Sequence, residues 1–163
     1  MRYERLFVAL EAVLLALWAG AMAGFAFIFA PVASRHIGNM ETFAAMIAAV
    51  IRALTAFGNV CGALAVALSL ARAFSPRART LACVRIGLVA VGLAASAYET
   101  SAIIPRMEAT AAQIPGPIDS VPKTDARRIA YDREHTNSTR VYGLAFLCVL
   151  AAVALVPFGR RSE

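Results

Sequence analysis

Four long apolar stretches dominate the pattern of hydrophobic and polar positions along the chain. The runs with few or no charges cover residues 12–33, 53–71, 86–104 and 141–159. A helix of about 20 apolar residues crosses the hydrocarbon core of a bilayer, and lipid offers no partners for unpaired backbone groups. Each run therefore predicts a membrane-spanning helix. With their flanking residues, the predicted spans cover about residues 6–33, 43–72, 81–104 and 138–158.

The arrangement of these spans predicts an all-α, polytopic membrane protein with one domain over residues 1–163. Four consecutive spans form an antiparallel bundle. The connection over about residues 105–137 is predicted to be an extramembrane helical hairpin, with a non-helical turn around Pro115 and Pro117. Asp125 follows Thr124 and is typical of a helix N-cap. The fourth helix is therefore expected to start there and to extend beyond the bilayer.

The first apolar stretch has two possible interpretations. Arg2, Arg5 and a small-residue segment at 21–23 resemble parts of a secretory signal peptide. Glu11 lies inside the apolar stretch, however, and the apolar run continues ten residues beyond position 23. A signal peptide has an apolar core of about 7–15 residues, so a retained first span is favoured.

Composition excludes an ordinary soluble domain. The chain is 60% hydrophobic and only 16% charged, and its mean hydropathy is +0.68. The formal net charge of +6 does not indicate a nucleic-acid partner, because basic residues of membrane proteins gather in cytoplasmic loops. Four of the basic residues lie in or next to the short connection between the second and third spans: Arg72, Arg77, Arg79 and Arg85. We therefore expect both termini in the cytoplasm and the 105–137 connection on the outer side.

Small residues at helical spacing predict close contacts between helices. Gly20 and Gly24 lie in the first span, and Gly58 and Gly62 lie in the second. Such pairs allow helix backbones to approach closely. The contact is expected within the bundle, and the alternative is a homo-oligomer interface.

Charged residues inside the spans are costly and usually face the interior with a partner. Arg52 shares a helix face with Thr55 and Asn59, and Glu99 is expected at a similar depth. These four residues predict an intramembrane polar cluster with an Arg52–Glu99 pair. Two more charges predict an ion pair at the inner end of the bundle: Glu11 and Arg85. Each pair is either a structural device or part of a site for a ligand, proton or ion.

A possible metal site lies before the fourth span. Asp132 and His135 are three residues apart, so their side chains share one helix face, and His36 is expected on the same side of the membrane. This set could bind a metal or haem, or could form an interfacial helix end without chemistry. The three cysteines are isolated and fit small buried side chains. The chain contains no phosphate-binding loop, dinucleotide fingerprint or zinc-protease motif.

Three segments carry a resemblance to a known family. Residues 27–36 read FIFAPVASRH, residues 104–109 read IPRMEA, and residues 131–144 read YDREHTNSTRVYGL. Their order and spacing resemble bacterial membrane proteins of a domain-of-unknown-function family related to eukaryotic transmembrane protein 205. Glu134 departs from the family pattern, which usually has an apolar residue there. The resemblance implies a four-helix protein of the bacterial inner membrane, and the eukaryotic relative's link to platinum-drug resistance implies export.

Two functional hypotheses follow. The first is a non-enzymatic protein embedded in the lipid bilayer, either a transporter-like bundle or an accessory subunit of a larger membrane complex, with no cofactor and no nucleic-acid partner. The alternative is a metal- or haem-binding redox protein that uses His135, Asp132 and Glu99.

Overall fold

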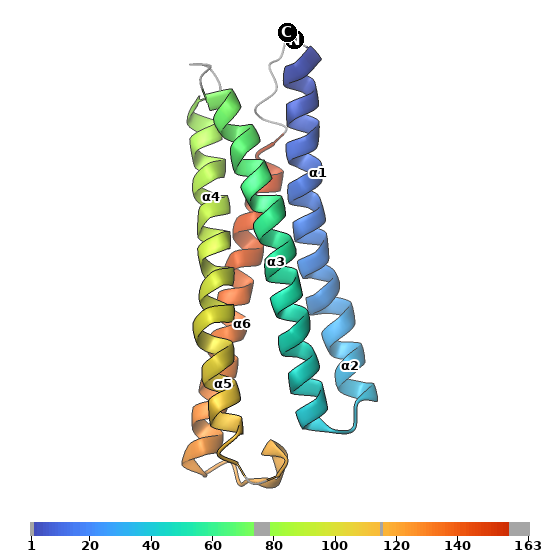
Figure 1. Cartoon of the computed structure of the whole chain (residues 1–163), viewed down its shortest axis with the longest axis vertical. Helices are drawn as coiled ribbons and strands as arrows, with labels where there is room; N and C mark the ends of the chain where they lie inside the picture. The colour runs from blue at the N-terminus through green and yellow to red at the C-terminus, as the bar shows by residue number, and fades with distance from the viewer. Residues whose placement is uncertain (1, 74–78, 115, 157–163) are drawn as a thin grey trace.

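The computed structural model describes residues 2–73, 79–114 and 116–156, and it contains four long antiparallel helices (Figure 1). The first comprises α1 (Arg2–Gly24), the π-helical turn η1 (Phe25–Phe29) and α2 (Ala30–His36). The second is α3 (Met40–Ala73). The third comprises α4 (Arg79–Tyr98), the π-helical turn η2 (Glu99–Ile103) and α5 (Ile104–Ala111). After a short 3-10 turn, η3 (Ile118–Ser120), the fourth is α6 (Ala126–Ala154). No strand occurs among the described residues, so the all-α prediction is confirmed.

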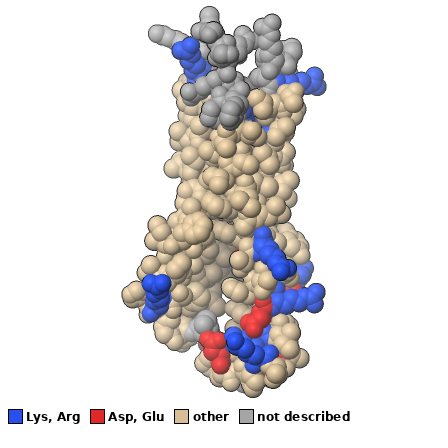
Figure 2. Space-filling view, turned by 180° about the vertical axis from the view of Figure 1, so that it is seen from behind, with Lys and Arg blue, Asp and Glu red and all other residues tan. Residues whose placement is uncertain are grey.

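All four helices are long and apolar enough to cross a membrane. The qualifying segments are Arg5–His36, Glu41–Ala71, Arg79–Ala111 and Ala126–Ala154. Large apolar side chains face outward along them, including Phe27 at 72% exposure and Leu147 at 62%. Figure 2 shows a broad band without charged side chains between two charged ends. The predicted membrane class is therefore confirmed.

The two ends of the bundle differ in the connections that they carry. At one end, called here the terminal end, α1 begins, α3 leads to α4, and α6 ends (Figure 1). At the other, called the hairpin end, α2 leads to α3 and α5 leads to α6. Two residues used in the sequence predictions lie outside the described residues: Arg77 of the basic connection and Pro115 of the predicted turn.

Two helices pass a proline without breaking. Proline cannot donate a backbone hydrogen bond, and its ring clashes with the carbonyl four residues earlier in a regular α-helix. In the first helix, the five-residue π-helical turn η1 ends two residues before Pro31. In the third helix, the turn η2 likewise ends two residues before Pro105. The Ala30 and Ile104 N–H groups donate to carbonyls five residues back. This wider turn relieves the clash, so both helices continue to the hairpin end.

The bundle core is built around Trp18, whose side chain is 1% exposed. A Cβ atom at Gly58 would lie 2.7 Å from Trp18 Cε2, and one at Gly62 would lie 3.1 Å from Cζ3. A Cβ atom at Gly92 would lie 3.3 Å from Cη2. The glycines of α3 and α4 therefore make room for the indole ring of Trp18.

Gly20 and Gly24 do not pack against another helix among the described residues of the chain, so the contact expected within the bundle is absent there, and the homo-oligomer interface stays a prediction. A Cβ atom at either position would meet no atom within 4 Å, and Gly20 is exposed. The spacing of two glycines identifies a shared helix face, but it does not say whether that face points into the bundle.

Candidate functional site

Glu99 is a buried carboxylate in the hairpin half of the bundle. It is the first residue of the π-helical turn η2, and its side chain is 2% exposed. Ser138 Oγ on α6 donates a hydrogen bond to Glu99 Oε1 over 2.6 Å. Single π-helical turns within α-helices frequently occur at functional sites, and here the turn opens on the only acidic residue of α4 and η2.

A small cavity with mixed polar and apolar walls lies beside Glu99. Its volume is about 10 Å³, close to the space that admits one water molecule. All four long helices line it, through Trp18, Met22, Ile51, Leu54, Thr55, Ser96, Glu99 and Tyr142. Tyr142 Oη donates to the main-chain carbonyl of Met22 over 2.9 Å, which ties α6 to α1. Thr55, Ser96 and Tyr142 thus line the same cavity as the Glu99 carboxylate.

The predicted pair between Arg52 and Glu99 does not form. Arg52 Nη2 lies 2.7 Å from Glu108 Oε1 on α5, and both side chains are about half exposed. No Lys, Arg or His among the described residues forms an ion pair with Glu99. Of the three residues predicted to share a polar face of this helix, Arg52 and Asn59 are exposed. Only Thr55 lines the cavity. Glu108 lies nine residues after Glu99 in the same long helix. It takes the place of Glu99 as the partner of Arg52, at the bundle surface.

The predicted pair between Glu11 and Arg85 does form. Arg85 Nε lies 2.9 Å from Glu11 Oε1, and each side chain is 1% exposed. Ser69 Oγ also donates to Glu11 Oε1, and Arg85 Nη1 reaches the Leu155 carbonyl over 3.5 Å. Arg85 and Glu99 are 14 residues apart, about 21 Å along a helix. The bundle therefore contains two buried polar layers, and Trp18 fills the apolar region between them.

The histidines do not converge on a metal site. His135 is exposed on α6, and Asp132 pairs with Arg128 over 3.1 Å. His36 Nδ1 lies 2.9 Å from the Val32 carbonyl in its own helix. Among the described residues, no group of three or more His, Cys, Asp or Glu side chains is placed to hold a metal ion. The proposed set of His135, Asp132, His36 and Glu99 is therefore not assembled.

Two residues of the site were not predicted as such: Ser138 and Tyr142. They are four residues apart on α6, so they share a helix face, and a polar pair at that spacing inside a span is the available signal. Trp18 gives no polar signal, and its place beside the cavity depends on the glycines of two other helices.

Comparison with known proteins gives a family for the chain. The sequence profile of one family, described as domain of unknown function (DUF4149), matches residues 13–115. The match covers the first helix from residue 13 onward and the second and third helices, and it includes Trp18, Gly58 and Glu99. No curated protein and no solved structure is significantly similar to the chain. Because the matched region covers more than half of the sequence, the chain belongs to the DUF4149 family.

Proposed function

We propose that this chain is a non-enzymatic, transporter-like membrane protein in which Glu99 binds and releases a proton. The resemblance of the 27–36, 104–109 and 131–144 segments supports a relation to transmembrane protein 205. The bacterial inner membrane is its proposed location, with the terminal end in the cytoplasm and the hairpin end outside. The burial of Glu99 with a hydroxyl as its hydrogen-bond partner is the observation that carries the functional proposal.

The energetic argument rests on the difference between the two buried carboxylates. An ionised carboxylate in a low-dielectric interior is strongly unfavourable unless a cation and hydrogen bonds compensate it. Arg85 supplies that cation for Glu11. For Glu99, the described residues supply hydrogen bonding from Ser138 only. A bound proton or cation is therefore needed to neutralise Glu99, and ionisable residues at such positions commonly belong to proton or ion pathways.

The size of the site favours a proton over a metal cation. Calcium takes six to eight oxygen ligands, and magnesium requires near-octahedral coordination. The cavity beside Glu99 has room for about one water and contains a single carboxylate. A proton needs neither more space nor more ligands.

Proton flux into liposomes tests the proposal. Purified protein is reconstituted with a trapped pH-sensitive dye, and a potassium diffusion potential made with valinomycin drives protons inward. We expect wild-type vesicles to acidify faster than protein-free vesicles. Glu99→Gln should abolish that difference, because glutamine keeps the size of the side chain and can accept from Ser138 but holds no exchangeable acid proton.

Glu108→Gln is the matched control. Glu108 is also a glutamate of the third helix, but it is half exposed and pairs with Arg52 at the bundle surface. It should leave the flux unchanged. Equal rates for wild type and Glu99→Gln, or for wild type and protein-free vesicles, would contradict the proposal.

A further inference from the structure

Glu134 on α6 has an unusual hydrogen-bonding state. Its Oε2 atom is buried and has no hydrogen-bond partner, and it is the only such side-chain nitrogen or oxygen among the described residues. Its Oε1 atom lies 4.0 Å from Arg106 Nη1 on α5. Buried polar atoms of native proteins nearly always have a partner, so an orphaned carboxylate oxygen indicates a bound water or ion.

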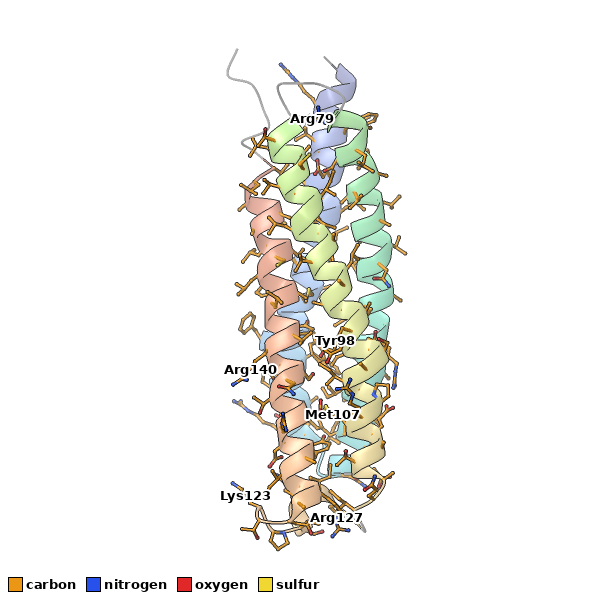
Figure 3. All side chains as sticks on the ribbon, turned by 90° about the vertical axis from the view of Figure 1, so that its left-hand side faces the viewer. Arg79, Tyr98, Met107, Lys123, Arg127 and Arg140 are labelled. Carbon is orange, nitrogen blue, oxygen red and sulfur yellow. The ribbon has the colours of Figure 1, made fainter. Side chains whose placement is uncertain are left out.

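The position of Glu134 links it to the Glu99 site. Glu134, Ser138 and Tyr142 follow each other at intervals of four residues, so they form one line along α6 with neighbouring side chains in reach of each other. Ser138 donates to Glu99, and Tyr142 lines the cavity. Glu134 therefore lies one helical turn from Ser138 toward the hairpin end. In Figure 3, α5 and α6 run side by side over this stretch, and Arg140 points away from the bundle.

The Glu134 side chain is 21% exposed, and its contact with Arg106 involves Oε1, so it does not satisfy the buried Oε2 atom. Arg106 is 54% exposed, and the two charged atoms are at the limit of an ion pair. Solvent-exposed ion pairs of this kind contribute little to stability. The guanidinium also lies 6.0 Å from the Tyr98 ring centre, which holds it at the bundle surface. Oε2 itself is buried and makes no contact with a hydrogen-bond donor in the described part of the chain.

We propose that Glu134 is the relay that passes protons between the hairpin end and Glu99, an inference that rests on the proposed function. A proton from water binds the Glu134 carboxylate. It then moves through a water at Oε2 to Ser138 Oγ, while Ser138 gives its own hydroxyl proton to Glu99 Oε1. One proton enters, one reaches Glu99, and the hydroxyl of Ser138 is restored.

The neighbouring charges are compatible with this route. The ionisable groups on the elements packed against this part of α6 are Tyr98, Glu99, Arg106 and Glu108. Glu108 is held by Arg52, and Tyr98 is exposed. From α1, Trp18 and Met22 line the Glu99 cavity, and neither side chain titrates at accessible pH. Along α6 toward the hairpin end, Glu134 is thus the carboxylate nearest to Ser138. Arg106, which is 54% exposed, lies beside it, 4.0 Å from Oε1.

Three substitutions in the liposome assay test the relay: Glu134→Gln, Glu134→Asp and Glu108→Gln. Glutamine preserves size but cannot carry a proton, whereas aspartate is shorter but can. We expect Glu134→Gln to slow the flux by about 100-fold, the lower range for loss of a proton-transfer group. Glu134→Asp should stay within about tenfold of wild type, since the acid remains, and Glu108→Gln should match wild type.

The outcomes separate the relay from the proposed function. Wild-type flux in Glu134→Gln, with flux still lost in Glu99→Gln, would overturn the relay alone. Equal flux in wild type and Glu99→Gln would overturn the proposed function. If glutamine and aspartate at position 134 slow the flux equally and both lower the melting temperature, the role of Glu134 is structural and the relay is wrong.

Discussion

At the scale of single residues, the core is fitted around one aromatic side chain. The glycines Gly58 and Gly62 were recognisable from their spacing, and their position between helices was predicted correctly. The indole of Trp18 between them was not, because a glycine pair shows only that space is needed. What fills that space depends on how α1 is rotated about its axis, and the sequence pattern does not determine this rotation.

Alanine at Gly58 is expected to destabilise the bundle. The new methyl group would overlap the buried Trp18 ring, and overpacking a core typically costs about 1–3 kcal/mol. Gly20→Ala is the matched control, since its methyl group would meet nothing within 4 Å and alanine favours a helix by roughly 1 kcal/mol. Thermal unfolding in detergent should give a lower melting temperature for Gly58→Ala only. Equal melting temperatures would show that Trp18 moves freely.

The Glu11–Arg85 pair should behave as a structural element. Arg85→Met removes the buried guanidinium and is expected to cost about 3–5 kcal/mol in free energy of unfolding. Replacing both residues, as in Glu11→Leu with Arg85→Met, should cost much less, because no uncompensated charge is then buried. Denaturation in mixed detergent measures both values. A double variant as unstable as Arg85→Met would contradict this account.

At the scale of elements, the helix ends follow local chemistry that is visible in the sequence. Asp125 is the N-cap of α6, as predicted, and accepts a hydrogen bond from the Arg127 N–H over 2.8 Å. Pro31 and Pro105 were also visible. The π-helical turns before them were not predicted, because proline reveals the strain but not how the backbone relieves it. Glu99 is the first residue of one of these turns.

The cap predicts a pH dependence of stability. The Arg127 side chain and backbone donate to Asp125 and hold its carboxyl pKa at about 2, below its ordinary value of 3.8. A pKa that folding lowers adds stability above 3.8 that is lost as pH falls toward 2. Asp125→Asn keeps a capping side chain but does not titrate. The melting-temperature difference between wild type and Asp125→Asn should therefore shrink from pH 4 to pH 2, and a constant difference would contradict the assignment.

At the scale of the whole molecule, the four spans and the all-α class were predictable because apolar length alone determines them. The partners of buried charges were only partly predictable. Sequence position gives the depth of a residue in the membrane, which sufficed for Glu11 and Arg85. It does not give the direction of a side chain around its helix, so it could not decide that Arg52 turns to Glu108 and that Glu99 faces Ser138.

Orientation in the membrane is a prediction at this scale. The basic residues near the terminal end should hold it in the cytoplasm. Green fluorescent protein fused to the C-terminus in bacterial cells should fluoresce, and alkaline phosphatase at the same place should be inactive. Phosphatase inserted between α5 and α6 should be active. The opposite pattern would reverse the proposed orientation.

The central claim, that Glu99 exchanges a proton inside the bundle, is tested most directly by one ratio. It is the initial rate of acidification of Glu99→Gln liposomes divided by that of Glu108→Gln liposomes, each after subtraction of the protein-free rate. The account predicts a ratio below about 0.01, as expected when a proton-transfer group is removed. A ratio near about 1, meaning no loss of proton transfer, would contradict it.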